Sequence, residues 1–216
     1  MRIFAVTPIH VSAEELARRQ ARYDALSPDG LSVHLEDIGP DAPRALDTEE
    51  QVRASDELVT AALERAAGRA DGIDAVMPDC VLDPGVARLA GRLERPVFGL
   101  LRTSLAWGAI TGRPVGAVTR NKAIAEELRR QVEGYGMAGS FTGVEVLDLD
   151  VDAIHDAGRW AASLHEVVER MGEAGAGDLL NGCSAVDLPP EAAQWPVRVV
   201  DPTALALRLI AAGALA

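Results

Sequence analysis

Short β-like runs alternate with longer amphipathic segments along most of the chain, and this alternation limits the possible folds more than any other feature. Parallel strands need a crossover connection, usually a helix, so the pattern is typical of parallel sheets covered by helices. The sequence therefore predicts an α/β fold. The expected strands are 3–7, 31–35, 73–77, 97–100, 115–119, 141–146, 178–180 and 197–200, and the expected helices are 13–25, 49–67, 84–93, 122–135, 151–171 and 203–214.

Several helix starts carry capping signals. Ser12, followed three residues later by Glu15, forms the pattern of a capping box. Asp83-Pro84 and Asp201-Pro202 each combine an N-cap carboxylate with a proline suited to the first helical position. The least regular stretch, residues 37–48, is predicted to be an exposed loop.

The composition excludes several classes of partner. The 216 residues include 33 acidic and 21 basic side chains, a net charge of −12. Nucleic acids and anionic membranes would be repelled, so we expect neither as a partner. The apolar run near the N-terminus is too short for a signal peptide, and the sequence has no 18-residue apolar stretch. We therefore expect a cytoplasmic protein with reduced thiols.

Cofactor and metal signals are missing from the sequence. Two cysteines cannot form a disulfide-rich scaffold, and the four histidines lack the short spacings of metal ligands. Neither glycine-rich phosphate-binding motif occurs, since the glycines at 175 and 177 precede a strand and lack the required spacing. We expect no metal and no cofactor.

The two cysteines end similar segments of the chain. ERAAGRADGIDAVMPDC ends at Cys80 and ERMGEAGAGDLLNGC ends at Cys183, about half a chain apart. In each, a helix leads through a glycine-containing loop and a short strand to the cysteine. A chance match is one interpretation; the other is two similar lobes, each placing a thiol at one cleft, because ligands bind at the carboxyl ends of parallel strands.

A single buried cysteine is most often packing material, but two thiols across a cleft have a specific chemistry. One, as a thiolate, removes a proton from a carbon next to a carbonyl, and the other returns a proton to the opposite face. Main-chain N–H groups and helix N-termini near each sulfur would stabilise a thiolate or an enolate oxygen. A separation of roughly 7 Å between the sulfurs, twice a close approach of reacting atoms, would suit this task.

Both cysteine segments resemble those of hydantoin racemases, within the wider aspartate/glutamate racemase superfamily. Cys80-Val81-Leu82-Asp83-Pro84-Gly85 is similar to their Cys-x-x-Asp-Pro-Gly segment, and Asn181-Gly182-Cys183-Ser184 to their second cysteine segment. The resemblance implies two pseudo-symmetric lobes, each a small parallel sheet flanked by helices, with the active site in the cleft between them. It places residues 1–98 and 200–216 in the first lobe and 99–199 in the second, and makes Cys80 and Cys183 a cofactor-independent acid/base pair.

The chain also departs from the pattern of that family. Thr7-Pro8-Ile9-His10 replaces a usual Asn-Pro-Asn-Thr. Asp79 precedes the first cysteine, where its charge would oppose thiol ionisation unless its side chain points away or binds a cation. These changes predict the same chemistry on a different substrate. His10 either borders the cleft or is a surface or capping residue. Arg120 either pairs with a substrate carboxylate or is solvated. The predicted substrate-binding residues are Pro8, His10, Val81, Thr119, Arg120, Gly182 and Ser184.

The first hypothesis is thus a racemase or epimerase acting on a carbon alpha to a carbonyl, in a hydantoin or an amino-acid derivative. An alternative is an enzyme of the same fold that relies mainly on one cysteine, like a maleate isomerase or an arylmalonate decarboxylase. A second alternative is a small-molecule-binding protein without catalysis. The expected partners are a small carbonyl or carboxylate substrate and further copies of the chain, in a homo-oligomer.

Overall fold

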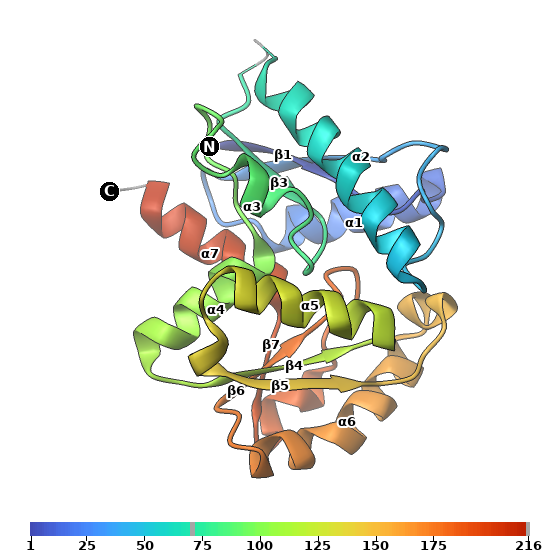
Figure 1. The fold of residues 1–216 in the computed structure, drawn as a ribbon, viewed down its shortest axis with the longest axis vertical. Helices are drawn as coiled ribbons and strands as arrows, with labels where there is room; N and C mark the ends of the chain where they lie inside the picture. Colours follow the sequence, from blue (N-terminus) through green and yellow to red (C-terminus); the bar gives the residue numbers. More distant parts are fainter. Residues whose placement is uncertain (70–71, 215–216) are drawn as a thin grey trace.

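The strands form two separate parallel sheets, one in each half of the molecule (Figure 1). The computed structural model describes residues 1–69 and 72–214. All strand pairs are parallel, which confirms the α/β prediction. The first sheet has the order β2-β1-β3, with β1 at Arg2–Val6, β2 at Ser32–Glu36 and β3 at Ala75–Pro78; the second has the order β5-β4-β6-β7, with β4 at Val115–Thr119, β5 at Phe141–Val146, β6 at Asp178–Asn181 and β7 at Arg198–Val200.

Helices cover both faces of each sheet. Along β1, alternate side chains point to opposite faces: Phe4 packs in the core that α2 covers, and Ile3 in the core that α1 and α7 cover. In the second sheet α5 and α6 take the two faces. The helices are α1 (Ala13–Leu26), α2 (Glu49–Ala67), α3 (Val86–Leu89), α4 (Leu100–Thr111), α5 (Lys122–Gly134), α6 (Ala157–Glu173) and α7 (Pro202–Ala214), with 3-10 turns η1 (Ala138–Ser140), η2 (Val151–His155) and η3 (Pro190–Gln194).

The two halves repeat one topology. In each sheet the first strand of the half is central, with β1 between β2 and β3 as β4 is between β5 and β6. The counterpart of β7 in the first half is a single parallel bridge from Val97 to Val76 of β3. The prediction of a strand at 97–100 is therefore wrong. Only Val97 forms a bridge, and α4 already begins at Leu100.

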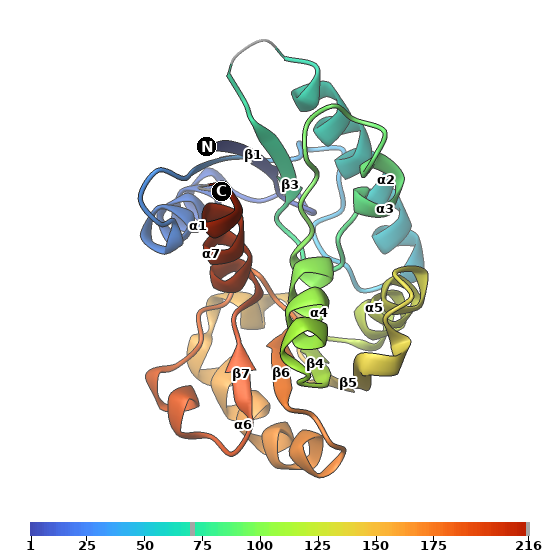
Figure 2. The ribbon, with the colours of Figure 1, turned by 90° about the vertical axis from the view of Figure 1, so that its left-hand side faces the viewer.

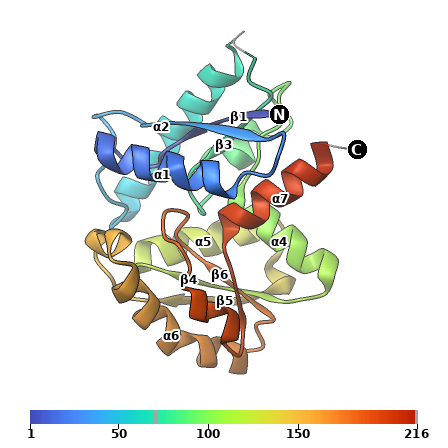
Figure 3. The same ribbon diagram turned by 180° about the vertical axis from the view of Figure 1, so that it is seen from behind.

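The last helices of the two halves are exchanged. Leu101 and Leu105 of α4 pack in a core with Val115 and Ala117 of the second sheet. Conversely, α7 at the end of the second half returns to pack on the first sheet, and it lies against α4 in the middle of the molecule (Figure 2). Figure 3 shows α7 from behind, crossing from the second sheet toward the first. The domain boundaries at 98/99 and 199/200 stay a prediction.

The structure corrects the expected helices in three places. The helix expected at 84–93 is only the single turn Val86–Leu89, and α4 was not predicted at all. The single helix expected at 151–171 is interrupted at Asp156, whose carboxylate accepts the Arg159 N–H and begins α6. Among residues 1–69 and 72–214, no helix has the length and apolar character needed to cross a membrane.

Of the three capping signals, that of Asp201 is confirmed, Ser12 is an N-cap without the predicted capping box, and the interpretation of Asp83 is wrong. Ser12 accepts the main-chain N–H of Glu15 at 3.1 Å, although the Glu15 carboxylate bonds to arginines rather than completing a capping box. Asp201 accepts the N–H groups of Thr203 and Ala204. Asp83 does not cap α3, the helix that follows it in sequence.

Truncation of Leu207 tests the packing of α7 on the first sheet. Leu207 is fully buried in that core, so Leu207→Ala is expected to lower the free energy of unfolding by about 2–5 kcal/mol. Urea denaturation followed by circular dichroism measures this change. The exposed neighbour Arg208 provides the control, since Arg208→Ala is expected to stay within about 0.5 kcal/mol of the parent; equal effects would contradict the packing.

Candidate active site

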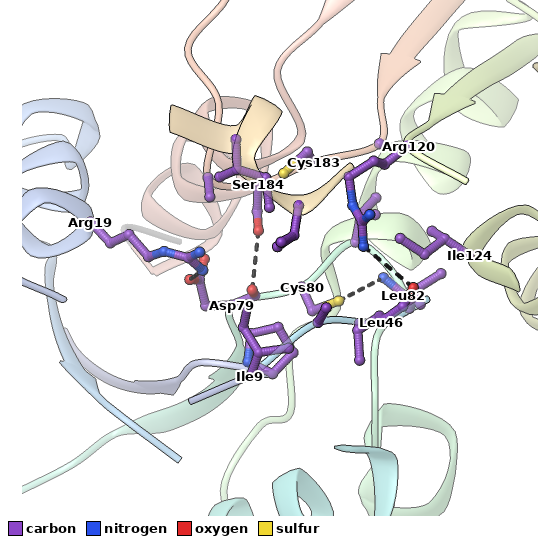
Figure 4. A pocket seen from close by; sticks show the side chains of 17 residues that line it. Ile9, Arg19, Leu46, Asp79, Cys80, Leu82, Arg120, Ile124, Cys183 and Ser184 are labelled. Atoms are coloured by element: carbon purple, nitrogen blue, oxygen red, sulfur yellow. Dashed lines mark hydrogen bonds and ion pairs between the residues drawn. The ribbon is translucent and has the colours of Figure 1, made fainter. Parts of the chain in front are cut away.

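A pocket that is partly open to solvent lies between the carboxyl ends of the two sheets and holds both cysteines. The strand registers explain its position. Val6 lies opposite Pro78, and Val118 opposite Asn181, so the loops after these strands leave each sheet at one edge. Figure 4 shows the pocket, which is lined by Pro8, Ile9, Arg19, Ala45, Leu46, Asp79, Cys80, Val81, Leu82, Arg120, Ile124, Val151, Ile154, Gly182, Cys183, Ser184 and Ala185.

Cys80 follows β3 at the start of a tight turn. The N–H of Asp83 donates to the Cys80 carbonyl at 3.1 Å, and the N–H of Leu82 points at the Cys80 sulfur at 3.5 Å. Cys80 is a free thiol with only 7 % of its surface exposed. The turn thus holds the sulfur against a main-chain donor inside the pocket.

Asp83 fastens this turn to α4, the helix that packs on the second sheet. Its backbone is left-handed (φ 52°), and its carboxylate accepts the N–H groups of Leu101 at 3.0 Å and Arg102 at 2.8 Å. It therefore caps α4, not the helix that follows it in sequence. Tyr135 donates a third hydrogen bond at 3.0 Å. A Cβ at Gly99 would lie 2.4 Å from the Asp83 carboxylate, so only glycine permits this approach.

The turn that carries Cys183 depends on Asn181 at the end of β6. The Asn181 amide donates to the carbonyls of Val186 at 3.1 Å and Cys183 at 3.3 Å, and its oxygen accepts the indole N–H of the fully buried Trp160. Gly182 packs so closely on β4 that a Cβ would lie 1.9 Å from the Val118 carbonyl oxygen. The segment Asn181-Gly182-Cys183 is therefore fixed from both sides.

Direct contacts join the two cysteine turns. The Ser184 hydroxyl donates to the main-chain carbonyl of Asp79 at 3.1 Å, across 105 positions of sequence (Figure 4). Arg18 on α1 donates to the Ala185 carbonyl at 2.9 Å. The two thiols are consequently held in one pocket by bonds between the halves.

Asp79 is neutralised by a cation that the sequence analysis did not identify. Arg19 on α1 donates from Nη1 to the Asp79 carboxylate at 3.1 Å, and Tyr23 donates to its other oxygen at 2.8 Å. Glu15 holds the Arg19 Nε at 2.6 Å. Both Arg19 and Asp79 are almost completely buried. Of the two alternatives that the sequence left open for Asp79, the structure shows the binding of a cation.

Arg120 lines the pocket and fastens the irregular loop. Its guanidinium forms an ion pair with Asp47 at 2.6 Å and donates to the Leu149 carbonyl at 3.2 Å. Asn121 donates to the Leu46 carbonyl at 2.9 Å. Residues 37–48 therefore form a loop, as predicted. The end of this loop lies against the pocket, and Ala45 and Leu46 form part of the pocket lining.

Most of the predicted site residues gather in this pocket, whereas two lie outside its lining. Pro8, Val81, Arg120, Gly182 and Ser184 line it with the cysteines. His10 instead pairs through Nδ1 with Asp37 at 2.7 Å. Thr119 is buried, and its hydroxyl donates to the Asn121 carbonyl at 3.3 Å.

A family model described as Asp/Glu/Hydantoin racemase matches residues 13–210 of the chain. The chain belongs to this family. It is therefore an enzyme of the racemase type, an isomerase, and the family resemblance drawn from the two cysteine segments is confirmed. No curated protein matches the chain by sequence.

Solved structures of racemases share the fold. An allantoin racemase from Klebsiella pneumoniae aligns over 100 % of this chain and 88 % of its own, with 21 % identity and a TM-score of 0.79. An allantoin racemase from Pseudomonas fluorescens aligns over 100 % and 91 %, with 15 % identity and a TM-score of 0.82. An arylmalonate decarboxylase also shares the fold. It aligns over 98 % of this chain and 92 % of its own, with 15 % identity and a TM-score of 0.60.

In this member of the racemase family, the surroundings of the two thiols differ in charge. Burial raises the pKa of Cys80, the Leu82 N–H opposes this effect, and negative charges at Asp79 and Asp83 raise it further. Burial also raises the pKa of Cys183, and the negative charge of Asp79 raises it further, whereas the Ala185 N–H and the positive charges of Arg19 and Arg120 lower it. The pKa of each thiol thus lies above its ordinary value, and positive charges oppose the effect of burial at Cys183.

The Asp83 cap is tested by truncation. Asp83→Ala leaves two N–H groups at the start of α4 without their acceptor, and is expected to cost about 1–3 kcal/mol of stability. Thermal unfolding measures the loss. Tyr135→Phe removes only the hydroxyl donor and is expected to cost less; a larger effect for Tyr135→Phe would show that the cap is not the dominant interaction.

Proposed function

We propose that the chain is a cofactor-independent racemase or epimerase in which Cys80 and Cys183 move a proton at a carbon alpha to a carbonyl. The observation that carries this proposal is the presence of both free thiols in one pocket, each after the corresponding strand of its own sheet. A thiol can act as a general acid and a thiolate as a general base.

The reaction needs only one proton to be removed and one to be added. The thiolate of one cysteine takes the alpha proton, and the electron pair of the C–H bond becomes that of an enolate. The other thiol then protonates the opposite face of the carbon and is left as a thiolate. The N–H groups of Val81 and Ser184 have no acceptor within residues 1–69 and 72–214, and they are suited to donate to the enolate oxygen.

The pocket favours a neutral substrate that carries an apolar substituent. The charges that line it are already paired, Arg19 with Asp79 and Arg120 with Asp47. A further substrate charge would therefore lack a free counter-ion. A hydantoin ring is neutral, and allantoin, named in the similar structures, is itself a substituted hydantoin. The apolar lining residues are Ile9, Leu46, Val81, Leu82, Ile124, Val151 and Ile154.

A one-cysteine enzyme is the second candidate, because the two thiols differ in their charged surroundings. A decarboxylase of that kind would need a single proton donor after loss of carbon dioxide. A third candidate is a binding protein that keeps the pocket without turnover. Replacement of each cysteine separates these three functions.

Solvent deuterium exchange is the test of the two-cysteine reaction. Incubation of a single enantiomer of a substituted hydantoin in D₂O is expected to give racemisation together with deuterium at the alpha carbon, followed by polarimetry and proton NMR. Cys80→Ser and Cys183→Ser are each expected to reduce racemisation by at least about 10³-fold, since a hydroxyl is a far weaker acid and base at neutral pH.

The pattern of loss distinguishes the candidates. A racemase loses racemisation with either substitution, although a single variant can retain exchange at the face of its remaining thiol. Full racemisation by one of the variants would contradict the proposal and favour a one-cysteine enzyme. Tight binding of the hydantoin without exchange in the parent protein would favour a binding protein.

Substrate charge provides a separate test. We expect kcat/KM for hydantoins with an aliphatic or aromatic substituent to exceed that for free aspartate or glutamate by at least about 10²-fold, because an unpaired carboxylate in this pocket loses its hydration without gaining a counter-ion. Steady-state polarimetry on such a panel measures the ratio. Preference for the dicarboxylates would overturn the neutral-substrate assignment.

A further inference from the structure

Arg120 is a buried cation in the pocket wall, and its charge is balanced by a carboxylate that is half in solvent. Arg120 follows β4 directly, lines the pocket and has only 5 % of its side chain exposed. Its Nη2 lies 2.6 Å from the carboxylate of Asp47. Asp47 belongs to the loop at 37–48, and 49 % of its side chain is exposed. The cation of this pair therefore faces the pocket more closely than the anion does.

The guanidinium shares the pocket with the two thiols. Arg120 lines it together with Cys80 and Cys183, and in Figure 4 the two cysteines lie between Arg120 and Arg19. A substrate whose alpha carbon sits between the thiols can therefore place its substituent beside Arg120. The net charge at this part of the wall then decides which substituents are accepted.

The position of Arg120 does not depend on Asp47 alone. Nη1 donates to the Leu149 carbonyl at 3.2 Å, and Nη2 donates to the Leu46 carbonyl at 3.5 Å (Figure 4). The side-chain amide of Asn121 holds the same Leu46 carbonyl at 2.9 Å. None of these three hydrogen bonds uses the Asp47 carboxylate, so the guanidinium is expected to stay in the wall when the charge of Asp47 is removed.

The second charge pair of the pocket is built differently. Arg19 and Asp79 are both almost completely buried, and Glu15 and Tyr23 bind them further. Replacement of either partner would leave an uncompensated charge in the interior. Asp47 is half exposed, so its replacement changes the charge of the wall at little cost in packing. Of the two carboxylates, Asp47 is therefore the one that can set selectivity without disturbing the fold.

We propose that Asp47 determines the charge of the substrate that this pocket accepts. With Asp47 in place, the charge of Arg120 is neutralised and offers little attraction to an anion, so a neutral substituent is preferred. Without that carboxylate, the same guanidinium is an uncompensated cation beside the substrate and binds a carboxylate through charge-assisted hydrogen bonds. The proposal rests on the proposed function, because it explains why that pocket favours neutral substrates.

Two hydantoins that differ in charge alone test this assignment. One carries an acetate substituent and the other the acetamide of the same shape, and isothermal titration calorimetry measures the Kd of each. The parent protein is expected to bind the acetamide at least about tenfold more tightly. In Asp47→Asn, which keeps the shape of the side chain but not its charge, the ratio of the two Kd values is expected to shift toward the acetate by at least about tenfold. An unchanged ratio would overturn the proposal.

A matched control is available on the same loop. Asp41 is exposed, so Asp41→Asn removes one negative charge from the loop and is expected to leave the ratio unchanged. An equal shift in Asp41→Asn would assign the effect to the overall charge of the chain and would overturn the role of Asp47. If Asp47→Asn does not fold, as judged by circular dichroism, Asp47→Ser makes the same change in charge and decides the question.

A double variant shows whether Arg120 is the group that binds the acetate. Asp47→Asn combined with Arg120→Gln is expected to lose the gain in acetate binding, because the uncompensated cation is then missing. A gain that persists in the double variant would overturn the role of Arg120 and, with it, the proposal.

Deuterium exchange separates this proposal from the proposed function. A shifted Kd ratio in Asp47→Asn, without exchange in the parent, would support the role of Asp47 and overturn the racemase reaction. Normal exchange in the parent with the same Kd ratio in Asp47→Asn would overturn the role of Asp47 alone. Failure of both hydantoins to bind the parent and the variant would overturn both proposals.

Discussion

The buried ion pair between Arg19 and Asp79 is the interaction on which the pocket depends. A carboxylate beside Cys80, removed from water, is costly unless a cation and hydrogen bonds compensate it. Arg19 and Tyr23 provide both from α1. Removing one partner of such a pair typically costs about 3–5 kcal/mol, whereas the intact pair contributes little net stability. Its importance therefore lies in holding α1 against the first cysteine turn.

Each cysteine turn is held by a helix that packs on the sheet of the other turn. The turn of Cys80 is fastened to α4 through Asp83, and the turn of Cys183 receives hydrogen bonds from Arg18 and reaches back to Asp79 through Ser184. A shift of one lobe would therefore move the thiol of the other. The geometry of the pocket therefore depends on contacts between both sheets and their helices.

The sequence predicted the parts of the site that depend on local pattern. Runs of β-branched residues gave β4 and β5 with correct bounds, and the repeat that ends at Cys80 and Cys183 led to both thiols. Contacts between distant residues were not predictable in this way. In the sequence, Arg19 looks like an ordinary surface residue, because α1 is rich in charged residues. It is buried because α1 packs beside the end of β3, where Asp79 lies.

The same distinction explains the errors in secondary structure. The apolar residues at the start of α4 fit a strand as well as a buried helix, since periodicity does not separate the two over a short run. Asp83 carries a local capping pattern, but the N–H groups it binds are 18 and 19 residues away in sequence. Gly99 was the one available sign of this contact in the sequence, because a residue without a Cβ lets the Asp83 carboxylate reach the start of α4.

The exchanged position of α7 has a consequence for synthesis of the chain. β1 is made well before α7 during translation, yet both belong to the core that contains Ile3 and Leu207. The second sheet, with α4 already made, can be completed earlier. Domains usually form from the N-terminus onward during translation; here the core around β1 is finished only once α7 has left the ribosome.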